Sequence, residues 1–139
     1  MKNDDITVVG GLILKDNKLL ICQRSFNSEH SLKWEFPGGK VKTLEEPKEA
    51  LKRELNEELK ININHPIYLC DYSFEYKNLG KKVKLIFFLI DGFIGEILNT
   101  VHNQLKWIEI KELSDYDFLD GDKVIIKQIL KNELKINRS

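Results

Sequence analysis

The segment GGKVKTLEEPKEALKRELNEELKI, residues 38–61, constrains the fold of this chain more than any other part of it. Glu54, Glu57 and Glu58 stand at positions i, i+3 and i+4. On a helix of 3.6 residues per turn, their side chains fall within an arc of roughly 100° on one face. Leucines recur beside that face at every fourth position, at Leu51, Leu55 and Leu59. We therefore expect a helix that buries its leucine flank and presents three carboxylates to a site.

Three carboxylates on one helix face favour a divalent cation. Like charges at these spacings cost about 0.2–0.5 kcal/mol per pair in an isolated helix, and a bound cation removes that repulsion. Oxygen ligands are typical of Mg²⁺ or Mn²⁺, and the segment carries no Cys or His that would indicate zinc. Pro37 stiffens the entry to Gly38 and Gly39, whose backbone lacks Cβ atoms and can approach a metal or a phosphate closely. The loop and the helix together predict a metal-dependent site.

The same residues fit a known sequence pattern. Counted from Gly39, the segment matches G-x5-E-x7-R-E-U-x-E-E-x-G-U, where U is aliphatic, and so resembles the Nudix box. The matching residues are Gly39, Glu45, Arg53, Glu54, Leu55, Glu57, Glu58 and Ile61. Lys60 replaces the late glycine of the pattern, which usually ends the helix in a left-handed conformation. A lysine in that conformation costs about 1 kcal/mol. The departure therefore concerns the end of the helix and not the chemistry.

The resemblance extends over nearly the whole chain. The run WEFPGGK at 34–40, the strand KWIEI and a closing helix are similar to MutT-type Nudix hydrolases from about Ile6 to Leu130. This resemblance implies an α/β (α+β) fold, an α/β/α sandwich around a mixed β-sheet. A length of 139 residues fits one compact domain over residues 1–139.

The resemblance also implies a role for each residue of the box. The family pattern assigns the metal ligands to the carbonyl of Gly39 and the carboxylates of Glu54, Glu57 and Glu58. Arg53 orients these acids, with Glu45 as its ion-pair partner, and Gly38 supports the loop. Glu54 is the candidate for taking the proton of the attacking water, either directly or through a water that the metal activates. The expected catalytic residues are Arg53, Glu54 and Glu57.

One acid that many relatives carry is absent from this chain. Aligned on Trp107, the loop before the last strand has Val101 where such relatives have a glutamate. Either the acids of the box suffice, or Asn103 or Gln104 positions a water instead. His102 could assist as well, but the interpretation favoured for the histidines is that of exposed loop residues: His30, His65 and His102.

Two residues outside the box are candidates for substrate binding. Arg24 ends the second strand, where MutT relatives place an arginine that contacts phosphate. Asp122 aligns with an Asn or Asp that reads the base in relatives, and its alternative role is the cap of the closing helix. An ionised carboxylate only accepts hydrogen bonds, so such a reader favours oxidised guanine, whose N7 has become a donor, or cytosine. Aromatic side chains at strand spacing are more often core than base-stacking, and no role is assigned to Trp34, Tyr72, Phe74 or Phe87.

The balance of positive and negative residues indicates which class of partner the protein binds. Lys and Arg together number 22, as do Asp and Glu, so no net positive field favours a long nucleic acid. A small nucleotide is the expected partner. No stretch is long enough to cross a bilayer and the first residues lack a cleavage signature, so we expect a cytoplasmic protein without membrane contact, as a monomer or homodimer. Cys22 and Cys70 stand singly in apolar runs, which predicts buried thiols without a chemical role.

Residue patterns predict the order of elements. Strands are expected at residues 6–14, 18–24, 34–36, 67–76, 82–92 and 104–110. Turns are expected at Asp16–Asn17 and at 78–80, and loops at 25–33 and 93–103. Pro47 opens the box helix after Glu46 as its cap, and the chain is expected to fray from Asn132.

Three functions are compatible with these residues. The first is Mg²⁺-dependent hydrolysis of a nucleoside triphosphate, such as 8-oxo-dGTP or a cytosine nucleotide, to the monophosphate and pyrophosphate. The second is hydrolysis of dinucleoside polyphosphates, ADP-ribose or a capped RNA end by the same box. The third is a non-catalytic nucleotide-binding domain, which the intact acidic set argues against. The resemblance to MutT favours the first.

Overall fold

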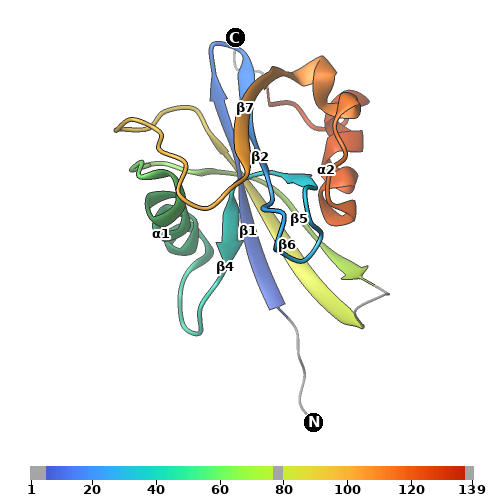
Figure 1. The fold of residues 1–139 in the computed structure, drawn as a ribbon, viewed down its shortest axis with the longest axis horizontal. Helices are drawn as coiled ribbons and strands as arrows, with labels where there is room; N and C mark the ends of the chain where they lie inside the picture. Colours follow the sequence, from blue (N-terminus) through green and yellow to red (C-terminus); the bar gives the residue numbers. More distant parts are fainter. Residues whose placement is uncertain (1–5, 77–79, 137–139) are drawn as a thin grey trace.

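A mixed β-sheet organises the molecule (Figure 1). The computed structural model describes residues 6–76 and 80–136. Within them, seven strands form one sheet in the order β3-β2-β1-β6-β5, with β4 paired to β1 and β7 paired to β2. The strands are β1 Ile6–Lys15, β2 Lys18–Gln23, β3 Trp34–Glu35, β4 Gly38–Lys40, β5 Ile67–Tyr76, β6 Lys81–Ile90 and β7 Gln104–Glu109. The helices are α1 Pro47–Leu59, the 3₁₀ helix η2 Ile110–Asp115 and α2 Asp120–Leu130.

Strand β1 lies at the centre of this sheet. It pairs in parallel with β6, from Ile6 opposite Val83 to Ile13 opposite Ile90, and antiparallel with β4 and the start of β2. The turn to β2 has Asp16 and Asn17 at φ of 53° and 63°. Two consecutive residues at positive φ are typical of the tight turn that joins antiparallel strands, so the predicted hairpin is confirmed.

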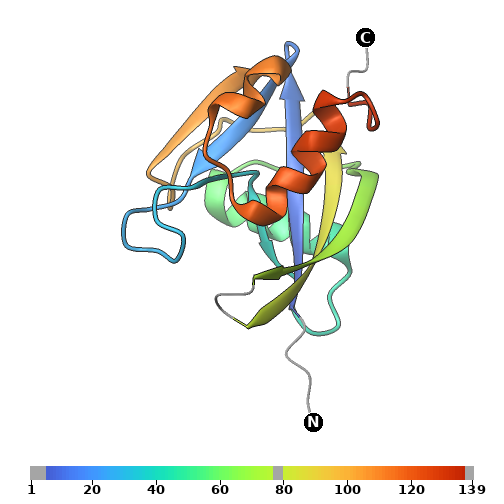
Figure 2. The ribbon, with the colours of Figure 1, turned by 90° about the vertical axis from the view of Figure 1, so that its right-hand side faces the viewer.

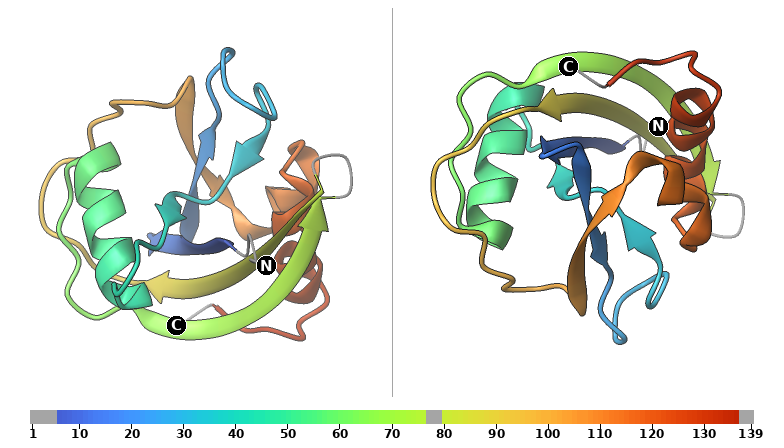
Figure 3. Two further views of the ribbon diagram at one scale, coloured as in Figure 1. Left: turned by 90° about the horizontal axis from the view of Figure 1, so that it is seen from below. Right: turned by 90° about the horizontal axis from the view of Figure 1, so that it is seen from above.

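The two long helices cover opposite faces of the sheet, as Figures 2 and 3 show. Helix α1 packs on one face, where its leucine flank is fully buried beside Val9 and Phe88. Helix α2 and η2 pack on the other face, where Phe87, Phe118 and Ile125 are at the core. Apolar side chains from both faces of β6 fill the two layers, as predicted for a strand buried on both sides. The α/β/α sandwich expected from the sequence is therefore present.

Helix α1 begins and ends where the sequence predicts. Pro47 is its first residue, and Glu46 precedes it without a side-chain hydrogen bond to the helix. Lys60 follows the helix at φ 61° and ψ 32°, and its N–H donates to the Asn56 carbonyl at 3.1 Å. The lysine thus adopts the left-handed conformation of the glycine that it replaces, and the exit of the helix is preserved.

The C-terminal part differs from the prediction in three respects. Helix α2 starts three residues earlier than expected, after Leu119, so Asp122 lies in its first turn and is not its cap. The 3₁₀ helix η2 was not predicted. The chain also does not fray at Asn132, because Glu133 N–H donates to the Gln128 carbonyl at 2.8 Å and Ile136 is 2% exposed.

Other expectations are tested only in part. The predicted turn at 78–80 lies mostly outside the described residues. Cys22 is buried, Cys70 is half-buried, and both are free thiols. None of the described helices combines the length and the apolar character needed to cross a membrane.

Candidate active site

The glycine pair lies against β1 and α1 with no room for a side chain. In β4, Gly38 pairs with Gly10 and Gly39 pairs with Val9. A Cβ atom on Gly38 would collide with the carbonyl oxygen of Val9, and one on Gly39 would overlap the carboxylate of Glu54. Gly38 therefore requires glycine, whereas a side chain at Gly39 would displace the Glu54 carboxylate, and the Gly39 backbone directly faces this acid of the box.

Arg53 connects the acids to the glycine strand. Its Nε and Nη2 donate to the two carboxylate oxygens of Glu45 at 2.8 and 2.9 Å, which is the predicted ion pair. Its Nη1 donates to Glu54 at 3.1 Å and to Glu57 at 3.3 Å, and Nη2 also donates to the Lys40 carbonyl at 3.0 Å. The hydrogen bonds from Arg53 hold the pKa of Glu45 down at about 2. One guanidinium therefore fixes three glutamates and β4.

Two of the box acids face a common pocket. The side chains of Glu54 and Glu58 are 15% and 23% exposed, and both line the pocket together with Gly39. The Glu57 side chain is 55% exposed and lies outside the pocket lining, held by Arg53. The structure thus brings Gly39, Glu54 and Glu58 together and leaves Glu57 at the rim.

Glu58 has a buried carboxyl oxygen without a partner. Its Oε1 is buried without a hydrogen-bond partner, and burial together with Glu54 and Glu35 raises the pKa of its carboxyl. Nowhere in the described chain do three or more His, Cys, Asp or Glu side chains already converge closely enough to hold a metal ion. A cation beside Glu58 Oε1 would nevertheless supply the missing partner and relieve the repulsion between acids. The residues present therefore fit a divalent ion.

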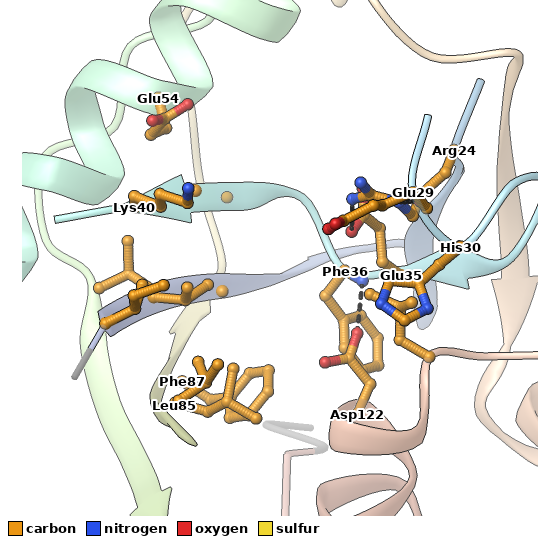
Figure 4. A pocket seen from close by; sticks show the side chains of 18 of the residues that line it. Arg24, Glu29, His30, Glu35, Phe36, Lys40, Glu54, Leu85, Phe87 and Asp122 are labelled. Atoms are coloured by element: carbon orange, nitrogen blue, oxygen red, sulfur yellow. Dashed lines mark hydrogen bonds and ion pairs between the residues drawn. The ribbon is translucent and has the colours of Figure 1, made fainter. Parts of the chain in front are cut away.

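The pocket runs from these acids to the start of α2 (Figure 4). Its volume is about 420 Å³. Glu54 and Lys40 lie at one end, Asp122 and His30 lie at the other, and Phe87 is at the apolar side between them. An elongated cavity with charged ends and an apolar wall suits a ligand that has both a charged and an aromatic part.

Asp122 is the buried polar group of this second end. It is 6% exposed, and its Oδ2 accepts a hydrogen bond from the Phe36 N–H at 3.2 Å. Burial, and then the charge of Glu35, raises the pKa of Asp122 to about 8. The protonated form of this carboxyl is therefore favoured in the free protein, and a protonated carboxyl can donate as well as accept. The role of Asp122 as a base reader, and the protonation state in which it acts, stay predictions.

Two tyrosine hydroxyls from β5 anchor the start of α2. Tyr72 donates to the Gly121 carbonyl at 2.7 Å and accepts from the Ile125 N–H at 3.1 Å. The Gly121 N–H donates to the Tyr76 hydroxyl at 3.2 Å. Because Leu119 cannot cap the helix, these hydroxyls satisfy its first backbone groups and fix the position of Asp122.

Arg24 lies at the same end of the pocket. Its Nη1 donates to Glu35 Oε1 at 3.0 Å, and its Nε donates to the Glu29 carbonyl at 2.8 Å. All three residues line the pocket. Arg24 therefore lines the pocket with its guanidinium already oriented, and its role in substrate binding stays a prediction.

Several pocket residues were not found from the sequence. Glu35, Lys40, Tyr76 and Lys81 were not among the candidates and all line the pocket. His30 lies in the loop after β2, half-buried, with its ring centroid 5.4 Å from that of Tyr76, so its interpretation as an exposed histidine is wrong. The alternation of Trp34, Glu35 and Phe36 before the glycines is the signal that could have identified Glu35.

The histidine of the loop before β7 is also buried. The His102 side chain is 5% exposed, and its Nε2 lies 3.6 Å from Glu35 Oε2 and 3.8 Å from Glu58 Oε1. The exposed-loop interpretation of His102 is therefore wrong, while His65 is exposed as predicted. Val101, beside it, is 53% exposed.

The two amides proposed to position a water point elsewhere. Asn103 Nδ2 and Gln104 Nε2 both donate to Gln23 Oε1, at 2.6 and 2.9 Å. Neither residue belongs to the pocket lining.

Comparisons with known proteins show the family to which this chain belongs. The family model of the NUDIX domain matches residues 5–129. An "8-oxo-dGTP diphosphatase" of Buchnera aphidicola is 36% identical over 125 residues, 89% of this chain and 92% of the relative. A "CTP pyrophosphohydrolase" of Escherichia coli is 31% identical over 125 residues, 90% of this chain and 91% of the relative.

A solved structure agrees in fold. The crystal structure of a MutT NUDIX hydrolase from Burkholderia pseudomallei superimposes with a TM-score of 0.83 at 25% identity, covering 91% of this chain and 99% of that one. The family match spans most of the chain, and the protein therefore belongs to the NUDIX domain family.

Proposed function

We propose that this protein is a MutT-like enzyme that hydrolyses a nucleoside triphosphate, with Mg²⁺ or Mn²⁺, to the monophosphate and pyrophosphate. The observation that supports this most directly is that one and the same pocket has box acids at one end and the buried Asp122 at the other. The polyphosphate of a nucleotide fits between the box acids and Arg24, and its base fits beside Asp122. The proposed single domain over residues 1–139 and a cytoplasmic location stay predictions.

The acidic end holds the metal in this proposal. The groups that hold it are the Gly39 carbonyl and the carboxylates of Glu54, Glu57 and Glu58. A divalent ion there neutralises charge on the polyphosphate and activates water. Glu54 receives the proton of the attacking water, since its carboxylate lies against Gly39 within the pocket. Arg53 and Glu45 keep Glu54 in place through their hydrogen bonds.

Arg24 binds a phosphate group of the substrate. Its Nε and Nη1 already bond to Glu29 and Glu35, and a guanidinium has five N–H groups in all. The remaining groups are available to phosphate oxygens, and the Glu35 carboxylate holds the guanidinium in position.

Asp122 reads the base. A protonated carboxyl donates one hydrogen bond and accepts another, which matches an edge with one acceptor and one donor. Guanine oxidised at C8 offers O6 and N7–H, and cytosine offers N3 and its N4 amino group, whereas ordinary guanine presents two acceptors, O6 and N7. One mismatched buried contact costs about 1–3 kcal/mol, or roughly 5-fold to 150-fold in discrimination. We therefore infer a preference for 8-oxo-dGTP or a cytosine nucleotide over dGTP.

A nucleotide panel tests the proposal. Turnover of 8-oxo-dGTP, dCTP, CTP, dGTP, ADP-ribose and a dinucleoside tetraphosphate would be measured with and without Mg²⁺, and the products separated by ion-exchange chromatography. We expect monophosphate and pyrophosphate from the first three, with Asp122→Ala reducing their advantage over dGTP. Preferential cleavage of the last two substrates would move the protein to the second class of Nudix hydrolase. Absence of metal-dependent turnover on every nucleotide would indicate a binding domain.

A further inference from the structure

The loop before β7 is attached to the last turn of α1. Leu98 N–H donates to the Leu59 carbonyl at 2.9 Å. The hydroxyl of Thr100 donates to the Glu58 carbonyl at 2.9 Å, and the Thr100 N–H approaches the same oxygen at 3.3 Å. Carbonyls at the end of a helix lack partners within the helix, and this loop supplies them. The loop therefore moves with the segment of α1 that carries Glu58.

The backbone of His102 is held on both sides. Asn99 Oδ1 accepts from the His102 N–H at 2.9 Å, and Asn99 Nδ2 donates to the His102 carbonyl at 2.8 Å. The next residue, Asn103, donates its N–H to the Gln23 carbonyl of β2 at 2.9 Å. These bonds determine the direction in which the His102 ring points.

The two ring nitrogens of His102 have different surroundings. Nε2 faces two carboxylates, Glu35 at 3.6 Å and Glu58 at 3.8 Å, and the nearer Glu58 atom is the buried Oε1 that has no hydrogen-bond partner. Nδ1 is buried and also has no partner. Contacts of this kind in the free enzyme are often longer than a hydrogen bond and shorten in the complex. Nε2 is thus the ring nitrogen positioned to bond to the carboxylates of Glu35 and Glu58.

The same contact joins both ends of the pocket. Glu35 accepts from Arg24 through Oε1 and faces His102 through Oε2. The side chains therefore form a continuous series, Arg24, Glu35, His102 and Glu58, from the proposed phosphate contact to the proposed metal ligand. The loop before β7 thus contributes an imidazole to this series.

We propose that His102 is a positioning residue whose Nε2 holds Glu58 Oε1, so that the Glu58 carboxylate keeps its orientation toward the metal site and stays linked to Glu35 and Arg24. This inference rests on the proposed metal-dependent function. Partners that orient a metal-binding side chain contribute roughly 10-fold to 100-fold in metal affinity or activity. A neutral imidazole whose proton is on Nε2 can donate the hydrogen bond to Glu58 that this role requires.

Two substitutions of His102 distinguish the role of Nε2 from that of Nδ1. His102→Gln places an amide N–H near the position of Nε2, while His102→Asn reaches only the position of Nδ1. The control is His65→Gln, because His65 is exposed and is not part of the pocket lining. Mn²⁺ binding without nucleotide would be measured by electron paramagnetic resonance, alongside thermal melting and the Mg²⁺ dependence of kcat and KM.

We expect His102→Asn to weaken Mn²⁺ binding by roughly 10-fold and to raise the Mg²⁺ concentration for half-maximal kcat by a similar factor. His102→Gln should keep Mn²⁺ affinity and the Mg²⁺ concentration for half-maximal kcat close to the wild-type values. His65→Gln should match the wild type in both measurements. Equal behaviour of the Gln and Asn variants, whether both intact or both impaired, would overturn the role of Nε2. If neither variant folds, Asn99→Ala loosens the His102 backbone and must weaken Mn²⁺ binding, or the inference is wrong.

Measurements on the wild-type protein test the proposed function separately from the role of His102. Wild-type protein that neither binds Mn²⁺ nor hydrolyses any nucleotide would remove the proposed function itself. Wild-type protein that does both, beside an unaffected His102→Asn variant, would remove only the role of His102.

Discussion

At the scale of single residues, Arg53 determines how the acids of α1 are arranged before any ligand binds. It bonds to Glu45, Glu54 and Glu57 at once, so these carboxylates do not spread apart despite their charge. Because the pKa of Glu45 is lowered, this pair stabilises the folded state above the ordinary carboxyl pKa, and the contribution is lost as the pH falls toward about 2. The acidic arrangement therefore persists across the neutral range.

Glu57→Gln tests the acidic arc directly. The variant keeps the shape of the side chain but removes a charge proposed to bind the metal, so we expect hydrolysis to fall by at least about 100-fold, or about 2.7 kcal/mol. Because Glu57 is largely exposed in a cluster of like charges, the Tm of the metal-free variant should equal that of the wild type or be slightly higher. Circular dichroism and Mg²⁺-dependent turnover provide the two measurements. Glu49→Gln, an exposed glutamate of the same helix, is the control, and nearly full activity of Glu57→Gln would remove Glu57 from the metal site.

Asp122→Asn tests the buried carboxyl through pH. The pKa of Asp122 is about 8 in the folded protein, against an ordinary value near 4. Between these values the unfolded chain has lost the proton and the folded protein keeps it, so wild-type stability falls as pH rises through this window and the loss is complete above about 8. Asparagine can still accept from the Phe36 N–H and does not titrate.

The difference in Tm between Asp122→Asn and the wild type should therefore grow from pH 4 to pH 9, by at least about 4 °C, the shift that roughly 1 kcal/mol produces. Melting curves at several pH values measure it. Asp117→Asn, at an exposed ion pair with Lys33, should give a much smaller change. A difference that does not vary with pH would show that Asp122 ionises as freely in the folded protein as in the unfolded chain.

At the scale of elements, the end of α1 carries a cost that the sequence already indicated. Lys60 is held at positive φ, where glycine is about 1 kcal/mol more favourable. Lys60→Gly should therefore raise Tm by roughly 2–4 °C without changing activity. Lys60→Ala is the matched control, because alanine has the same conformational penalty as lysine, and differential scanning calorimetry would compare all three. A gain in the alanine variant as well would assign the effect to charge.

Elements with strong local signals could be predicted from the sequence. The leucines of α1, the proline at its start and the turn residues Asp16 and Asn17 act within a few positions, so the helix and first hairpin agree with the structure. The box glycines and Arg53 also lie where the pattern implies. The start of α2 was misplaced because its first backbone groups bond to tyrosine hydroxyls of β5, far away in sequence.

The buried histidine could not be predicted for a similar reason. His102 lies in a loop without periodicity, and its burial depends on how Thr100 and Asn99 attach that loop to α1 and to itself. Such contacts arise only once the sheet has brought β7 beside β2. Local sequence pattern identifies the residues of the box that form the candidate site. Tertiary contacts determine which loop residues, such as His102, lie beside them.

At the scale of the whole molecule, the C-terminal tail completes the core beneath α2. Ile136 is 2% exposed within the cluster that contains Phe118 and Ile125. Ile136→Ala should therefore lower the free energy of unfolding by about 2–4 kcal/mol, since a buried aliphatic side chain is removed. Leu130→Ala is the control, because Leu130 is 40% exposed and should cost far less. Urea denaturation measures both, and equal costs would place the tail outside the core.

The parallel pairing of β1 with β6 has a consequence for folding kinetics. Ile6 pairs with Val83, and α1 with all of its acids lies in the intervening chain. This long loop must close before α1 can pack on the β1–β6 surface, and closing such loops slows folding. Truncations inside the pair, Val9→Ala and Leu89→Ala, should therefore lower the refolding rate in stopped-flow experiments more than they raise the unfolding rate. On the ribosome, the helix that carries the acids would be made early and remain without its docking surface until β6 has emerged.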